Sequence, residues 1–106
     1  MLTEVTLADL EQAQVDGAVI VDVRESEEYR AGHVAGAISI PLSVVPVRAH
    51  ELTRDQPVYL VCQGGGRSFQ AAESLDRAGY DARSVAGGTG AWLSAGKPVV
   101  TGRSPR

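Results

Sequence analysis

Two continuous apolar runs constrain the fold of this chain more than any other feature of its sequence. They are AVIVDVR (18–24), which is rich in β-branched residues, and PVYLVC (57–62). Runs of this kind, without alternating polar positions, are typical of strands that are buried on both faces. The short stretches AISIP (37–41) and ARSVAG (82–87) indicate further strands. Because amphipathic segments separate the runs, the sequence predicts an α/β fold with a small, mainly parallel central sheet and helices on both faces.

Residues typical of helix ends lie between the strands of the first half. Thr6, with Asp9 three residues later, predicts a capped helix over 7–14. Ser26 is expected to cap a second helix, because two glutamates follow it and favour the first turn. Gly32 is expected to end that helix.

The second half of the chain contains the clearest helix, over residues 68–78. Its small and apolar residues share one face, and Gly79 is expected to end it. A short last helix is expected over 89–96. The segment 42–52 stays ambiguous, because Pro46 interrupts its helical spacing.

Length and charge limit the classes of protein to which the chain can belong. Its 106 residues predict a single domain, with a core over about 4–100 and a polar tail, 101–106, that is expected to fray. The net charge is −3 and no cluster of Lys and Arg is present, which argues against nucleic-acid partners and an anionic membrane surface. No apolar run approaches the roughly 18 residues of a membrane span, and no secretory signal is recognisable at the N-terminus. One cysteine excludes an internal disulfide and a multi-cysteine zinc site, and fits a reducing compartment, so a cytoplasmic location is expected.

The single cysteine, Cys62, ends the second apolar run and precedes three glycines and Arg67. Parallel sheets bind ligands at the carboxyl ends of their strands, which is where this thiol is expected. The glycines allow left-handed backbone that turns successive amides inward, and the helix that follows adds the positive end of its dipole. Such surroundings stabilise a thiolate, and Arg67 would add a full positive charge. The sequence therefore predicts a nucleophilic cysteine inside a ring of backbone amides.

Other chemistries of glycine-rich loops fit the spacing less well. A dinucleotide-binding fingerprint would need glycine where Phe69 stands, and the Gly-Lys-Ser/Thr of a phosphate-binding P-loop is absent. The loop of a cysteine phosphatase is one residue longer between cysteine and arginine. A Cys–His pair with His33 or His50 stays open, because sequence alone does not place either residue beside Cys62.

Three stretches together resemble the rhodanese (sulfurtransferase) family. CQGGGRS (62–68) is similar to its active-site loop, C-x-x-G-x-R-S. VDVRESEEYRAGHVAGAISIP (21–41) and AGGTGAWLSAGKPV (86–99) are similar to its upstream and closing motifs. The three occur in the order of the family and extend over nearly the whole chain.

This resemblance implies a single-domain rhodanese fold and a thiosulfate sulfurtransferase-type enzyme that works through a persulfide on Cys62. It places the sulfur-binding loop at the residues after the nucleophile: Gln63, Gly64, Gly65, Gly66, Arg67 and Ser68. Thiosulfate or a persulfide is the implied donor, a thiol, cyanide or a protein the implied acceptor, and neither a metal nor an organic cofactor is implied. The alternative is a carrier module that relays persulfide to one protein partner. Gln63 departs from the basic residue that many thiosulfate-using members carry, which questions efficient use of thiosulfate.

Several other polar and small residues have a structural interpretation. Asp22 and Arg24, at the end of another strand, are expected to form a pair that holds the fold, with a role beside the site as the lesser alternative. His33 is expected to be structural at a helix end. His50 and the acidic cluster 25–28 are expected on the solvated surface. The remaining expectations are a core position for Trp92 and a tight turn at Gly87 and Gly88.

Overall fold

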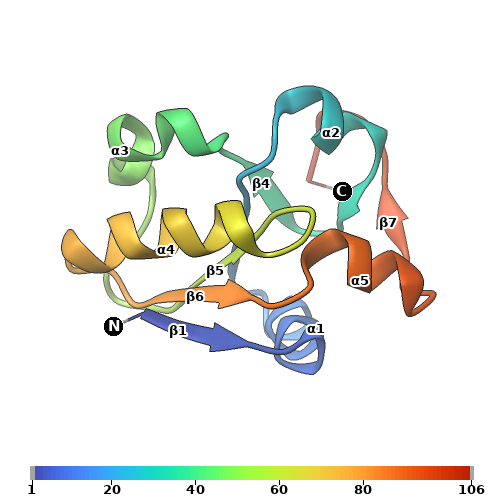
Figure 1. The fold of residues 1–106 in the computed structure, drawn as a ribbon, viewed down its shortest axis with the longest axis horizontal. Helices are drawn as coiled ribbons and strands as arrows, with labels where there is room; N and C mark the ends of the chain where they lie inside the picture. The colour runs from blue at the N-terminus through green and yellow to red at the C-terminus, as the bar shows by residue number, and fades with distance from the viewer. Residues whose placement is uncertain (1, 106) are drawn as a thin grey trace.

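A five-stranded sheet forms the centre of the molecule in the computed structural model, which describes residues 2–105 (Figure 1). Its strand order is β1-β6-β5-β2-β4, and all neighbouring strands are parallel. The strands are β1 (Leu2–Val5), β2 (Val19–Asp22), β4 (Ala37–Ser39), β5 (Val58–Val61) and β6 (Ala82–Val85). Met1 and Arg106, which the expected domain includes, lie outside the described residues.

Helices cover both faces of this sheet, as the alternation of apolar and amphipathic segments predicts. One core cluster joins the sheet to α3 and α4, and a second joins it to α1 and α5, on the opposite face (Figure 1). The helices are α1 (Leu7–Val15), α2 (Ser26–Ala31), α3 (Val45–Arg48), α4 (Gly66–Arg77) and α5 (Gly88–Ser94). No helix among residues 2–105 has the length and apolarity that crossing a membrane requires.

The strand β5 determines which face the thiol occupies. Leu60 and Cys62 belong to the core cluster under α4, whereas Val61 belongs to the cluster that contains Trp92 of α5. This division follows from the alternation of side chains along a strand. Cys62 therefore faces α4, the helix that begins directly after its loop. Trp92 is buried, as its predicted core position requires.

The structure confirms one of the two predicted N-terminal helix caps and contradicts the other. The cap of α1 is confirmed: the Asp9 N–H donates to Thr6 Oγ1 at 3.2 Å, and the Thr6 N–H donates to Asp9 Oδ2 at 2.9 Å. The prediction of Ser26 as the cap of α2 is wrong, since the helix starts at Ser26 and its cap is Glu25. The Glu25 N–H donates to the carboxylate of Glu28 at 3.0 Å, the bond that a capping box supplies.

The ambiguous segment 42–52 forms three short helical pieces. They are η1 (Leu42–Val44), α3 (Val45–Arg48) and η2 (Ala49–Glu51). Pro46 lies in the first turn of α3, where a missing N–H costs no helical hydrogen bond. The proline thus divides the segment without excluding helix from it.

A second, two-stranded sheet was not expected from the sequence. β3 (His33–Val34) pairs antiparallel with β7 (Val99–Val100). The edge strand β1 was also not predicted, because two of its four residues, Thr3 and Glu4, are polar and exposed. Strands this short or this polar lack the apolar run from which the others were predicted.

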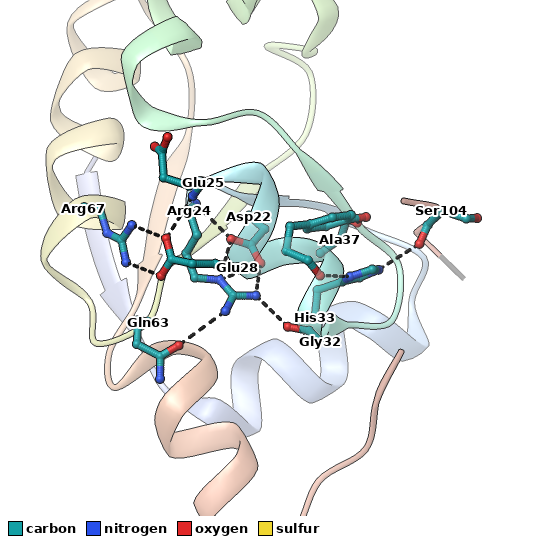
Figure 2. A network of polar contacts seen from close by, with 11 residues as sticks. Asp22, Arg24, Glu25, Glu28, Gly32, His33, Ala37, Gln63, Arg67 and Ser104 are labelled. Carbon is teal, nitrogen blue, oxygen red and sulfur yellow. Dashed lines mark hydrogen bonds and ion pairs between the residues drawn. The ribbon is translucent and has the colours of Figure 1, made fainter. Parts of the chain in front are cut away.

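The C-terminal tail is hydrogen-bonded to the body of the molecule, which differs from the expected fraying. The Gly102 N–H donates to the Arg30 carbonyl at 2.9 Å, and the Gly36 N–H donates to the Pro105 carbonyl at 2.8 Å. Between them, His33 Nε2 lies 2.8 Å from the Ser104 carbonyl oxygen (Figure 2). His33 is fully buried, in agreement with its expected structural role. The polar tail thus has hydrogen-bonding partners on the body of the molecule.

Candidate active site

Two neighbouring parallel strands bring the predicted site residues to one edge of the sheet. β2 pairs with β5 so that Asp22 lies opposite Val61. The residues that follow these two positions are Val23 and Arg24 on one side and Cys62 and Gln63 on the other. The carboxyl ends of the strands therefore place the Asp22–Arg24 pair beside the cysteine loop, as expected for a parallel sheet.

The thiol of Cys62 is buried and surrounded by hydrogen-bonding groups. Cys62 is 1% exposed. The Gly65 N–H donates to Sγ at 3.0 Å, and Ser68 Oγ lies 3.5 Å from Sγ. Ser68 Oγ is also 2.9 Å from Ser84 Oγ on β6 and donates to the Gly65 carbonyl at 3.0 Å. A chain of two hydroxyl groups thus leads from the sulfur atom into the sheet.

These surroundings favour the thiolate. Burial, the largest single effect, raises the pKa of the Cys62 thiol. Hydrogen bonds from the Ser68 side chain and from the backbone N–H groups of Ser68, Gly65 and Gly64 outweigh it, and the pKa lies below its ordinary value. The thiolate is the nucleophilic form of cysteine, so the geometry suits attack by Cys62 on an electrophilic atom.

The loop glycines contribute unequally to this ring of amides. Gly65 has a φ of +114°, a left-handed conformation that favours glycine, whereas Gly64 and Gly66 do not have positive φ. Gly65 is the N-cap of α4, which begins at Gly66 and not at Ser68 as predicted. The helix dipole therefore starts two residues closer to the thiol than the sequence indicated.

The first turn of α5 forms hydrogen bonds with the backbone of the cysteine loop. The Thr89 N–H donates to the Cys62 carbonyl at 2.8 Å, and the Gly90 N–H donates to the Gln63 carbonyl at 2.9 Å. A Cβ atom on Gly88 would lie 2.3 Å from the Cys62 carbonyl oxygen, and one on Gly90 would lie 3.0 Å from Gln63 Nε2. Gly88 therefore does more than form the expected tight turn with Gly87, and Gly90 has a similar close approach that was not predicted. The signal in the sequence is the spacing of glycines in GGTG (87–90), which permits two close backbone approaches.

Arg67 is bound by a carboxylate of the acidic cluster 25–28, for which the sequence predicts a solvated surface position. Its two η nitrogens donate to the two oxygens of Glu28, at 2.7 and 3.0 Å (Figure 2). The hydrogen bonds with Arg67 hold the pKa of Glu28 at about 2. The pKa of Arg67 is raised, chiefly by Glu28 and to a smaller extent by the charge of Cys62. Glu25 and Glu27 are exposed, as expected, whereas Glu28 is partly buried in an ion pair that the solvated-surface interpretation missed. The charge of Arg67 therefore acts on both Glu28 and Cys62.

Asp22 and Arg24 form the expected buried pair and also contact the loop. Asp22 is 0% exposed and Arg24 is 4% exposed. Arg24 Nη2 donates to Asp22 Oδ2 at 2.8 Å and to the Gly32 carbonyl at 2.8 Å. Its Nη1 donates to Gln63 Oε1 at 3.3 Å, which orients the amide group of this exposed side chain (Figure 2). The pair thus holds the fold, and Arg24 directly contacts Gln63, the residue after Cys62.

The structure does not form the alternative Cys–His pair. His33 lies between the carbonyls of Tyr29 and Ser104, and His50 contacts the Val47 carbonyl. Two hollows of the surface also lie away from the thiol. One, of about 160 Å³, is lined by Ser26, Tyr29, Arg30, Ser39 and Arg103. The other, of about 280 Å³, is lined by residues of α1, of β2 and of the segments that follow α1 and β3. Neither is lined by a residue of the cysteine loop, so the chemistry of this site depends on the loop itself.

Comparison with known proteins gives one consistent family. Residues 6–95 match the family of the rhodanese-like domain. A sulfurtransferase of Allochromatium vinosum is 32% identical over 103 residues, which cover 94% of this chain and 96% of that protein. The putative sulfur carrier protein YrkF of Bacillus subtilis is 43% identical over 61 residues, or 58% of this chain and 33% of YrkF.

The fold is also similar to that of a solved structure. The crystal structure of a rhodanese-related protein from Thermoplasma volcanium is 33% identical, with a TM-score of 0.87 over 94% of this chain and 99% of that one. The residues matched to the family, 6–95, include the unit of β5, cysteine loop and α4 around Cys62. The chain belongs to the family of rhodanese-like domains.

Proposed function

We propose that this chain is a sulfurtransferase that moves sulfane sulfur from thiosulfate or a persulfide donor to a nucleophilic acceptor, through a persulfide on Cys62. The observation that carries the proposal is the environment of Sγ, which accepts a hydrogen bond from the Gly65 N–H at 3.0 Å and lies 3.5 Å from Ser68 Oγ. The sulfurtransferase named among the relatives, which aligns over nearly the whole chain, supports it.

The proposed reaction has two half-reactions that balance without an external oxidant or reductant. In the first, the Cys62 thiolate attacks the outer sulfur of thiosulfate, and the S–S bond breaks with its electron pair leaving on sulfite. With a persulfide donor, the leaving group is a thiolate. In the second, cyanide or an acceptor thiolate attacks the outer sulfur, and the electron pair of the broken bond returns to Cys62.

The proposed roles of the loop follow from its contacts. Backbone N–H groups of Gly64, Gly65 and Ser68 stabilise negative charge on the sulfur, as an oxyanion hole does for oxygen. Gln63, exposed at the entrance to the loop, is proposed to contact the donor, and Arg67 to contribute positive charge. The chain has no second cysteine to release the sulfur as an internal disulfide, so transfer is proposed to an external acceptor in the reducing cytoplasm.

A second proposal is a persulfide carrier that serves one protein partner. The pairing of Arg67 with Glu28 favours it, because this pairing leaves less free positive charge for a small anionic donor. The relative YrkF, a putative sulfur carrier, agrees with it. Slow loading from thiosulfate together with rapid loading from a protein persulfide would distinguish a carrier from an enzyme with broad turnover.

The nucleophile can be tested by the substitution Cys62→Ser. After incubation with thiosulfate, the intact mass of the wild-type protein should increase by one sulfur atom, whereas the variant should gain none. Thiocyanate formation should fall on the order of a thousandfold or more, since a serine hydroxyl is not ionised near neutral pH. A circular dichroism spectrum serves as the control for folding. Thiocyanate formation that survives in the folded variant would contradict the persulfide mechanism.

A further inference from the structure

Two arginines, Arg24 and Arg67, lie at the entrance to the cysteine loop, by which we mean the surface around Gln63 and Arg67. Each forms an ion pair with a carboxylate. Arg24 is paired with Asp22, and Arg67 is paired with Glu28 (Figure 2). The formal charges of these four groups sum to zero. Glu28 also lies close enough to Arg24 for that charge to stabilise its carboxylate. Positive charge at this entrance is therefore largely committed to groups of the protein itself.

The position of Glu28 is fixed by hydrogen bonds from two elements. Its Oε1 accepts the Glu25 N–H at 3.0 Å, in the first turn of α2, and both of its oxygens accept from Arg67, in the first turn of α4. The side chains of Glu28 and Arg67 are each 35% exposed. An incoming anion that needs Arg67 must therefore compete with the partly buried Glu28 carboxylate. This carboxylate binds Arg67 through both oxygens and is also fixed by the Glu25 N–H.

Sulfur donors differ in the charge that they bring to this entrance. Thiosulfate is a dianion and approaches a cysteine that reacts as a thiolate, so its reaction requires positive charge near the sulfonate. A persulfide R–S–SH whose R group is uncharged makes no such demand.

We infer that Glu28 is a specificity-determining residue that, by holding Arg67, makes the site favour persulfide donors with an uncharged R group over dianionic thiosulfate. This inference rests on the proposed sulfur transfer and names its preferred donor class. With the favoured donor, the Cys62 thiolate attacks the outer sulfur of R–S–SH, a new S–S bond forms on Cys62, and the electron pair of the old bond leaves on R–S⁻. The products are Cys62–S–SH and the thiolate of the donor.

The substitution Glu28→Gln tests this directly, because glutamine preserves the capping box while removing the charge that holds Arg67. The rate of sulfur loading on Cys62 is followed by mass spectrometry with two donors, thiosulfate and 2-hydroxyethyl persulfide. We expect loading from thiosulfate to become about fivefold faster and to slow with added salt, as a newly freed cation would cause. Loading from 2-hydroxyethyl persulfide should change by less than about twofold. The control Glu27→Gln removes the same charge from an exposed position of α2 and should alter neither rate.

The wild-type protein supplies a second measurement that requires no variant. If Arg67 is occupied by Glu28, added salt should not slow wild-type loading from thiosulfate. Strong slowing by salt would overturn the inference, as would a Glu28→Gln variant with unchanged thiosulfate loading or with equal acceleration for both donors. Absence of sulfur on Cys62 with either donor, in all three proteins, would instead overturn the proposed function, and the inference with it.

Discussion

Ser68 connects the reactive sulfur with the interior of the fold. Its hydroxyl lies between Cys62 Sγ, the Gly65 carbonyl and Ser84 Oγ, and it is fully buried. A hydroxyl can donate only one hydrogen atom, so its direction depends on the state of the thiol. When Cys62 is a thiolate, we propose that Ser68 donates to sulfur while Ser84 donates to Ser68. This arrangement would let the fold respond to ionisation without moving the backbone.

The substitution Ser68→Ala should therefore raise the pKa of Cys62. The variant loses a hydrogen bond that favours the thiolate, while burial continues to favour the neutral thiol. Alkylation by iodoacetamide, measured as a function of pH, should show its midpoint at higher pH than in the wild-type protein. Stability should fall by about 1–2 kcal/mol, because the hydroxyl of Ser84 loses its partner in the core.

One comparison tests this interpretation of Ser68. Ser74→Ala, on the same helix, should leave the alkylation midpoint unchanged. An alkylation midpoint that is identical in Ser68→Ala and the wild-type protein would show that the backbone amides alone set the reactivity.

The lowered pKa of Cys62 also makes the stability of the fold depend on pH. Because this pKa is lower in the folded state, thiolate formation should stabilise the fold increasingly as pH rises from the folded pKa to the unfolded one. This contribution should be lost as pH falls through the folded value, and urea unfolding at several pH values measures it.

At the scale of elements, the helix α5 supports the cysteine loop. Its first turn donates to the carbonyls of Cys62 and Gln63, and the close approach is possible because Gly88 and Gly90 lack side chains. With these carbonyls engaged by α5, the N–H groups of the loop remain free to face sulfur. The closing glycine motif therefore contributes to the site by orienting the backbone, without contacting sulfur itself.

Gly88→Ala should be far more damaging than an alanine at another left-handed glycine. Gly88 has a φ of +55°, and its Cβ would lie 2.3 Å from the Cys62 carbonyl oxygen. Gly96 has a φ of +74° but no atom within 4 Å of such a Cβ, so Gly96→Ala measures backbone strain alone. We expect about 1–2 kcal/mol of destabilisation for Gly96→Ala and at least about 3 kcal/mol for Gly88→Ala. Urea unfolding measures both, and equal losses would show that the loop yields to the added methyl group.

The strands and contacts differ in how well the sequence alone predicts them. The central strands β2 and β5 were predicted because their apolar runs need no tertiary information. The ring of amides around Cys62 was predicted because it depends on local backbone. The ion pair of Glu28 was missed, since its partner Arg67 is 39 residues away and meets it only through the sheet topology. β3 and β7 were missed because a pair of two-residue strands carries no periodic signal of its own.

At the scale of the whole molecule, the C-terminal tail lies beside α2 and β3 (Figure 1). The ring of His33 stacks on Tyr29 with centroids 3.6 Å apart, and its two nitrogens lie near the carbonyls of Tyr29 and Ser104. Tyr29 in turn donates its hydroxyl to the Ala37 carbonyl of β4. The tail is thus linked through one buried histidine to the edge of the central sheet.

Shortening the chain to residues 1–101 should consequently destabilise the fold while leaving the chemistry of Cys62 intact. The shortened chain loses the bond of Gly102 to Arg30, that of Pro105 to Gly36, and the contact of Ser104 with His33. At about 0.5–1.5 kcal/mol for each hydrogen bond, we expect a loss of about 2–3 kcal/mol in urea unfolding. A chain that ends at Pro105 keeps all three interactions and serves as the control. Because none of them involves the cysteine loop, both proteins should load sulfur from a persulfide at the wild-type rate under native conditions. Equal unfolding free energies for the two shortened chains would mean that the tail contributes nothing to stability, whereas slower loading in the chain of residues 1–101 alone would show that the tail is coupled to the site through Arg24 and Gly32.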